Sequence, residues 1–351
     1  MESKRWYSLD ALRTLAMILM IQQHLGPWLW EHPWTDLINL FKKHPIFMGI
    51  NSLGGVAAPI FIILSGIGFT ISVEKGEKPK SILRRGVLIF ILGVILNHLS
   101  PSWFIPESWY VLHLIGFGTV VSLLFFRFHS ILMSLLAVFL LVVEGLFQQL
   151  LETPVVLTTT FFRNYGGWSG ILRYAFVEGH FPIFPWYPLF ILGIIVGRLI
   201  INKSYTRIAI LGVAILAGSL FSAIIGNRLD LWRYFQISPN FYPTNLPIML
   251  FLSSVVLFLI VIFIKFESWF ERRNFFTYPG RLTLTILFVH IVLFKEVSEN
   301  MGYYKIYSMR DTFLIISMVL VVIFIISYLW SKLKFFGSLE WIIRKMYGGG
   351  K

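Results

Sequence analysis

The sequence has no cysteine and few charged residues. Disulfide bonds and thiolate chemistry are therefore excluded, although this absence does not identify the redox compartment. Charged residues make up 13% of the chain and hydrophobic residues 57%, whereas soluble domains are about 25% charged and about 45–50% apolar. One water-soluble core cannot bury so much apolar surface. The composition therefore indicates a polytopic membrane protein and excludes disordered, collagen-like and nucleic-acid-binding classes.

Long apolar segments recur along the whole chain. A bilayer core of about 30 Å needs about 20 apolar residues per helix. The sequence therefore predicts an all-α transmembrane helix bundle of about ten spans. They cover residues 9–30, 55–73, 82–99, 109–126, 129–147, 182–202, 207–225, 247–266, 279–295 and 312–330.

The net charge of +13 bears on orientation more than on partners. If the N-terminus is cytoplasmic, 21 of the 30 Lys and Arg residues fall on the cytoplasmic side, which agrees with the positive-inside rule. We therefore expect a multi-pass protein of the cell membrane with both termini in the cytoplasm. Residues 1–335 form the predicted transmembrane domain. Residues 336–351 form a C-terminal segment that is amphipathic and expected to lie along the inner membrane surface.

The first span carries ionisable residues, which are costly at membrane depth. Ser8 is expected to cap the helix, with Asp10 in its first turn. Arg13 and His24 are eleven residues apart, which returns them to within about 20° of one face, about 16 Å apart along the axis. This face would present a cation near the cytoplasm and an imidazole near the outside. The alternative is that Arg13 extends to the inner headgroups and His24 lies in the outer interface.

Further basic residues begin two later spans. Arg84, Arg85 and Arg281 would form a basic cup with Arg13, or else reflect topology and anionic lipid alone. Polar groups are expected near the outer side, but no pair has a helical metal spacing and the histidines lack carboxylate companions, so no metal site is predicted. These outer groups are His32, His44, Asn51, Asn97, His98, His180 and His290.

Several stretches resemble one family in chain order. SLDALRTLAMILMIQQH (8–24) is similar to the opening helix of membrane-bound acyltransferases, which have Arg, ten residues, then His. GHFPIFPWYPLFILGIIVGR (179–198) resembles the Pro-x-x-Pro-Trp helix of bacterial relatives of heparan-alpha-glucosaminide N-acetyltransferase. Residues 111–118, 279–290 and 336–345 also look like this wider superfamily.

The resemblance implies transfer of an acetyl group from cytoplasmic acetyl-CoA to a sugar amine or hydroxyl, often on the far side of the membrane. Arg13, Arg84, Arg85 and Arg281 match the phosphates of acetyl-CoA in charge. His24 fits the Arg-x10-His pattern. The heparan branch instead places a catalytic His before the second helix, where His44 stands.

An acidic residue that this branch carries before a proline is missing here, because Val56-Ala57-Ala58 precede Pro59. His24 is expected to act as the general base, while a covalent acetyl-histidine stays open. Asn51, Asn97 or His44 is expected to donate a hydrogen bond to the oxyanion.

Two rival functions use the same residues. A transporter would take Asp10, Arg13 and the histidines as a substrate or proton path, and a lipid-binding or sensory scaffold would use the positive charge. The resemblance favours the acetyltransferase. Its expected partners are acetyl-CoA, a sugar or amino-sugar acceptor and membrane lipids, with no nucleic acid. The oligomeric state stays open, and a homo-oligomer is compatible with the sequence.

Overall fold

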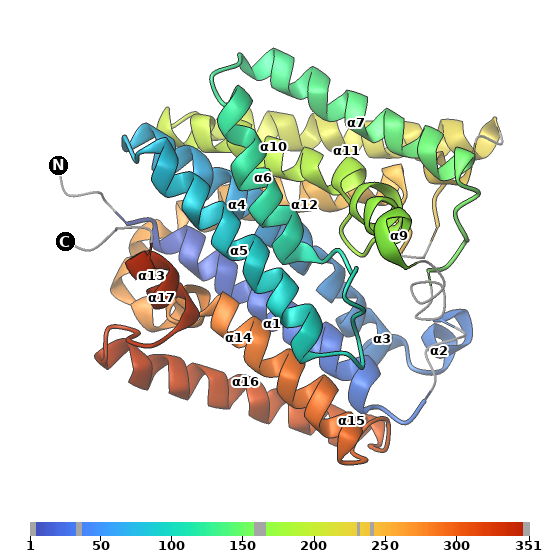
Figure 1. Ribbon diagram of the computed structural model, residues 1–351, viewed down its shortest axis with the longest axis vertical. Helices are drawn as coiled ribbons and strands as arrows, with labels where there is room; N and C mark the ends of the chain where they lie inside the picture. The colour runs from blue at the N-terminus through green and yellow to red at the C-terminus, as the bar shows by residue number, and fades with distance from the viewer. Residues whose placement is uncertain (1–4, 33–36, 158–165, 230–231, 239–241, 347–351) are drawn as a thin grey trace. The chain divides into compact units, whose positions relative to one another are not determined.

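A computed structural model describes residues 5–32, 37–157, 166–229, 232–238 and 242–346 (Figure 1). These residues are almost entirely helical and form no β-strand, which confirms the all-α class. The α-helices are α1 (Tyr7–Leu29), α2 (Leu37–Lys43), α3 (Pro45–Ser52), α4 (Ala57–Glu74), α5 (Pro79–Leu99), α6 (Val111–Phe125), α7 (Ser130–Leu150), α9 (Gly167–Arg173), α10 (Ile183–Ile201), α11 (Tyr205–Arg228), α12 (Leu246–Lys265), α13 (Glu267–Arg272), α14 (Thr283–Ile291), α15 (Ser298–Asn300), α16 (Met309–Lys332) and α17 (Leu339–Met346).

Short 3-10 and π turns connect several of these helices. The 3-10 turns are η1 (Leu53–Val56), η3 (Arg233–Phe235), η4 (Asn274–Thr277) and η5 (Pro279–Arg281), and the π turns are η2 (Tyr174–Glu178) and η6 (Val292–Val297). Helix occupies each of the ten segments that the sequence predicts as spans.

Seven of these stretches are long and apolar enough to cross a membrane by themselves, among the residues that the structure describes. The chain is therefore a multi-pass membrane protein. The count of ten spans and the cytoplasmic position of both termini stay predictions. The seven stretches are Pro45–Glu74, which joins α3 to α4, and α5, α7, α10, α11, α12 and α16.

The chain divides into two compact units. The terminal unit comprises Met1–Ile60, Leu99–Trp103 and Ile262–Lys351, and the middle unit comprises Phe61–His98 and Phe104–Val261. The amphipathic C-terminal segment is thus part of the same unit as the first span. The predicted separation of this segment from the membrane domain stays a prediction.

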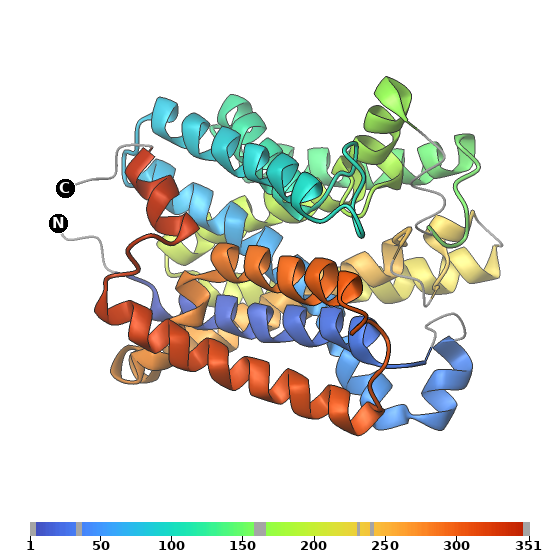
Figure 2. The same ribbon diagram turned by 60° about the horizontal axis from the view of Figure 1, so that its bottom comes forward.

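Helix α1 is the core of the terminal unit and lies between α14 and α16 (Figure 2). Its side chains Leu12, Ala16, Ile21 and Leu25 are completely buried. Burial on several sides of one helix explains why α1 has apolar residues around most of its circumference.

Contacts at both ends of α1 fix the directions of its neighbours. Gly280, just before α14, contacts the first turns of α1, and His290 near the end of α14 contacts His24 near the end of α1. The two helices therefore run in the same direction. Helix α16 runs in the opposite direction, because Trp30 after α1 forms a β-bridge with Tyr307 just before α16.

The predicted cap of α1 is wrong. Trp6, not Ser8, occupies the N-cap position and makes no side-chain capping bond, while Ser8 lies inside the first turn. The capping acceptor comes from α13, where the Glu267 carboxylate accepts the backbone N–H groups of Tyr7 and Ser8 at 2.9 and 2.8 Å. A carboxylate at this position satisfies orphan donors and complements the helix dipole, and it is remote in sequence. Asp10 lies in the first turn as predicted.

Helix α14 is capped in the same way by the C-terminal helix α17. The Glu340 carboxylate accepts the backbone N–H groups of Leu284 and Thr285 at 2.7 and 3.1 Å, and the Thr285 hydroxyl at 2.6 Å. Burial raises the pKa of Glu340, although these hydrogen bonds partly lower it. Helix α17 therefore caps the start of α14. Its predicted position along the inner membrane surface stays a prediction.

In the middle unit, α4 and α10 approach closely. A Cβ atom on Gly66 would lie 2.2 Å from the Phe190 carbonyl oxygen, and one on Gly193 would lie 2.2 Å from the Ile63 carbonyl oxygen. Only glycine allows the two backbones to pack at this distance, as is common where membrane helices cross. Helix α10 is accordingly the most buried of the seven candidate spans.

Candidate active site

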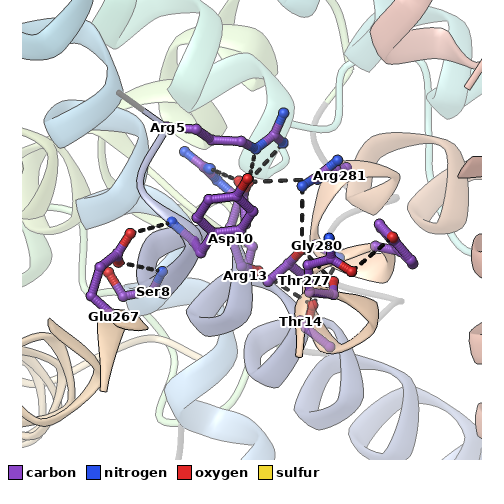
Figure 3. A network of polar contacts seen from close by, with 12 residues as sticks. Arg5, Ser8, Asp10, Arg13, Thr14, Glu267, Thr277, Gly280 and Arg281 are labelled. Carbon is purple, nitrogen blue, oxygen red and sulfur yellow. Dashed lines mark hydrogen bonds and ion pairs between the residues drawn. The ribbon is translucent and has the colours of Figure 1, made fainter. Parts of the chain in front are cut away.

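Three arginines surround one buried carboxylate at the start of α1 (Figure 3). Arg5 Nε and Arg13 Nη1 donate to the two oxygens of Asp10 at 2.7 and 2.8 Å, and Arg281 Nε lies 3.7 Å from Asp10 Oδ2. The sequence predicts a basic cup of Arg13, Arg84, Arg85 and Arg281, and two of these, Arg13 and Arg281, lie around Asp10. We call Arg5, Arg13, Arg281 and Asp10 the arginine cluster.

Backbone packing holds Arg281 in this cluster. The Gly280 backbone N–H donates to Thr14 Oγ1 at 2.9 Å, and a Cβ on Gly280 would lie only 2.0 Å from the Asp10 carbonyl oxygen. The guanidinium of Arg281 also lies 5.3 Å from the centre of the Tyr278 ring, within the range of a cation–π contact. Turn η5 thus packs directly against α1 at Gly280, the residue before Arg281.

The arginine cluster carries more positive than negative charge. One carboxylate balances only one of three guanidinium groups, and the side chains of Arg5 and Arg13 are 46% and 30% exposed. Guanidinium groups that are held in place and still accessible match phosphate groups in charge and in hydrogen-bond geometry. The cluster therefore has the chemistry to bind an anion such as the nucleotide part of acetyl-CoA.

His24 lies three turns further along α1 and contacts a second histidine. Its Nδ1 is 2.8 Å from Nε2 of His290, and the Nδ1 of His290 is 2.8 Å from the carbonyl oxygen of Ile286. His24 is half-buried, whereas His290 is 2% exposed. The two imidazoles and the carbonyl therefore form a continuous chain of hydrogen bonds.

Two tryptophans enclose the His24 ring. Trp28, one turn later on α1, stacks on it with ring centres 5.1 Å apart, and Trp103 meets it edge-on at 5.1 Å. Glu296 holds the segment that carries Trp103, because its carboxylate accepts the backbone N–H of Ser102 at 3.1 Å. Burial raises the pKa of Glu296, but hydrogen bonds from Ser102 and its neighbours lower it overall. The imidazole thus lies in an aromatic box that restricts its rotation.

His44 and Asn51 have other neighbours. His44 precedes α3 and packs edge-on against Trp30 at 5.2 Å, and its ring is 5.9 Å from His32. Asn51 is buried and donates to the Gln22 carbonyl at 2.9 Å, while the Gln22 amide donates back to the carbonyl of Asn51 at 3.2 Å. Asn51 therefore fastens α3 to α1 two residues before His24. The catalytic roles of both residues stay predictions.

Arg84 and Arg85 belong to the middle unit, whereas the arginine cluster belongs to the terminal unit. Arg84 is exposed on α5. Arg85 donates to Ser72 Oγ at 3.1 Å and pairs with Glu77 at 3.2 Å. Their predicted part in binding acetyl-CoA stays a prediction.

Sequence reasoning did not assign roles to Arg5 or His290. Arg5 precedes the apolar segment, and its sequence context indicates only a cytoplasmic charge. His290 was one of several scattered outer histidines, and its pairing with His24 depends on packing between helices that are far apart in sequence. The described residues contain no group of three or more side chains that could hold a metal ion.

The catalytic domain of heparan-alpha-glucosaminide N-acetyltransferase matches residues 5–239. The chain belongs to this family. A second family, of proteins of unknown function (DUF418), matches residues 190–349. No curated protein matches the chain.

This membership confirms the resemblance to membrane-bound acyltransferases and makes the chain an acetyltransferase-type membrane enzyme. The first match contains Arg13, His24, His44 and Asn51. Arg281 and His290 lie only in the second match. The two halves of the candidate site therefore come from segments that match different families.

Proposed function

We propose that this protein transfers an acetyl group from cytoplasmic acetyl-CoA to an amino sugar or a sugar hydroxyl at the outer side of the cell membrane. One observation carries the proposal: the same helix holds a cationic cluster at its start and a hydrogen-bonded imidazole three turns later. Arg13 and His24 are about 16 Å apart along α1, a distance that the flexible pantetheine arm of acetyl-CoA can cover.

The arginine cluster would bind the phosphates of the donor. Arg13 lies on α1, whose start is capped by Glu267, and Arg281 lies in η5, directly before the start of α14 that Glu340 caps. Both guanidinium groups are therefore carried by fixed backbone. Preorganisation of this kind reduces the entropic cost of binding. Arg5 extends the cluster, and Asp10 keeps the three cations together.

His24 would act as the general base. As the acceptor amine or hydroxyl attacks the thioester carbon, its proton moves to His24, a new C–N or C–O bond forms and the C–S bond breaks. The sulfur of CoA leaves as a thiolate and takes up a proton. An unperturbed imidazole has a pKa of about 6.5, so it can accept a proton at neutral pH. In the alternative route His24 first takes the acetyl group itself and then passes it to the acceptor.

A transfer assay with matched variants tests the proposal. Purified protein in lipid nanodiscs is incubated with acetyl-CoA labelled in the acetyl group and a panel of amino sugars and neutral sugars. We expect labelled product from the wild type and a loss of about 10²–10⁴-fold in kcat for His24→Ala. His44→Ala tests the competing base in a different aromatic cluster of the same unit, and His98→Ala, at an exposed histidine, is the control.

Full activity of His24→Ala together with an inactive His44→Ala would move the base to His44. Absence of transfer from the wild type to every acceptor, combined with uptake of solute into liposomes without an acyl donor, would instead support a transporter. The acid-quenched His24 peptide is also analysed for a bound acetyl group, which separates direct transfer from an acetyl-enzyme.

A further inference from the structure

We propose that His290 is a positioning residue for His24 and holds it in the tautomer whose Nε2 carries the lone pair. The inference rests on the proposed function and adds a residue to it. It comes from the direction in which the hydrogen bonds between Ile286, His290 and His24 must run.

The carbonyl oxygen of Ile286, at one end of this series of hydrogen bonds, decides their direction. The Ile286 carbonyl can only accept, so the Nδ1 of His290, 2.8 Å away, must carry the proton. In a neutral ring the Nε2 of His290 is then an acceptor. His24 Nδ1, 2.8 Å from it, must therefore be the donor. In a neutral His24 ring, the remaining nitrogen, Nε2, then holds the lone pair.

The opposite direction would require His290 to hold two protons. This ring is 2% exposed, and among the described side chains no carboxylate lies within ion-pair distance of it. A buried cation without a partner is costly. The neutral ring, with the protons placed as above, is therefore the favoured state.

The ring geometry supports this direction. The imidazoles of His24 and His290 are inclined by only 13°, so the N–H of one can point at the lone pair of the other in nearly the same plane. Trp28 stacks against both rings, at 5.1 and 6.1 Å. Trp103 meets the edge of His24. The aromatic box thus holds the orientation of the His24 ring, while the hydrogen bond to His290 sets its tautomer.

This arrangement has a role in each half of the reaction. Before transfer, it puts an unprotonated Nε2 on the base. Once Nε2 has taken the proton of the acceptor, His24 is a cation, and its Nδ1–H bond to His290 becomes charge-assisted and stronger. His290 forms no covalent bond and binds no substrate in this scheme, so it acts only through His24.

Two substitutions of His290 separate positioning from simple packing. His290→Leu removes the acceptor, and we expect kcat to fall about 10²-fold while the KM for acetyl-CoA stays within about twofold. His290→Gln can place an amide oxygen as the acceptor, and we expect kcat within about fivefold of wild type. His98→Leu is the matched control, because His98 makes the same contact to the carbonyl four residues earlier, at 2.9 Å, but is exposed. We expect it to keep wild-type kcat.

The tautomer is observed directly by nitrogen NMR on protein labelled with ¹⁵N-histidine in lipid, with His24→Gln used for assignment. We expect a protonated Nδ1 and an unprotonated Nε2 for His24 in the wild type, and a shift toward protonated Nε2 in His290→Leu. A protonated Nε2 in the wild type, wild-type kcat in His290→Leu, or equal losses in the Leu and Gln variants would overturn the inference. The NMR result does not depend on transfer, so an inactive wild type with the expected tautomer would count against the proposed function alone.

Discussion

Gly280→Ala is expected to destabilise the protein through one close backbone contact. The new Cβ would lie 2.0 Å from the Asp10 carbonyl oxygen and 2.9 Å from Thr14 Oγ1. The first neighbour is a backbone atom in the first turn of a buried helix and cannot rotate away. Turn η5 and α1 must therefore separate by about 1 Å, because close-packed interiors leave no room for the methyl group.

Two terms set the size of the effect. Overpacking of this kind costs about 1–3 kcal/mol. Loss of the hydrogen bond from the Gly280 N–H to Thr14 adds about 0.5–1.5 kcal/mol. We therefore expect a total of about 2–4 kcal/mol, which corresponds to a fall of about 3–5 °C in Tm for a chain of 351 residues.

The measurement is the thermal unfolding of detergent-solubilised protein, followed by size-exclusion fluorescence. Gly49→Ala is the matched control in the same unit, because a Cβ on Gly49 in α3 meets nothing within 4 Å, and alanine there gains up to about 1 kcal/mol of helix propensity. An unchanged Tm for Gly280→Ala would refute the close approach of η5 to α1. The displaced Arg281 should also raise the KM for acetyl-CoA.

Three further predictions concern the supports of the site. Arg13→Gln is expected to raise the KM for acetyl-CoA about 10-fold, and Arg5→Gln only about 2–5-fold because its side chain is half exposed. Both increases in KM should shrink in high salt. Equal KM values for the variants and the wild type would contradict the arginine cluster as the donor site. Glu340→Ala should cost about 1–2 kcal/mol of unfolding free energy because it leaves the start of α14 uncapped. Glu340→Gln retains an acceptor and should cost less. Thermal unfolding compares the two variants, and identical losses would argue against the cap. Asn51→Ala should lower stability by about 1–3 kcal/mol because it removes the contact to Gln22. A loss of kcat of about 10²-fold per folded molecule would support the predicted oxyanion role, and an unchanged kcat would contradict it.

The sequence alone was sufficient for the all-α class and for the positions of the helices. Hydropathy locates helices well because every backbone polar group in a bilayer must be satisfied within the segment itself. Helix occupies each of the ten predicted segments. The eleven-residue spacing predicted that Arg13 and His24 lie on one face of α1, because helical geometry is local and needs no tertiary information.

The helix caps show where local reasoning stops. Ser8 has the residue type of a cap, yet Glu267 provides the capping acceptor from α13, and Glu340 does the same for α14. A carboxylate that reaches a helix start from a distant element leaves no signal at the helix start itself. The sequence could therefore predict that α1 begins near Ser8, but not which residue satisfies its first N–H groups.

The sequence by itself determined that this is a helical membrane protein with Arg13 and His24 on one helix, because composition and periodicity are properties of single segments. The acyltransferase kind followed from the resemblance of its motifs to a known family. Only the tertiary structure decided which groups complete the site. The packing of α1 against η5 and α14 gathers Arg5, Arg13 and Arg281 around Asp10 and sets His290 beside His24. These pairings depend on the register between helices far apart in the chain, and a hydrogen bond of 2.8 Å requires that register to be correct to a fraction of a helical turn.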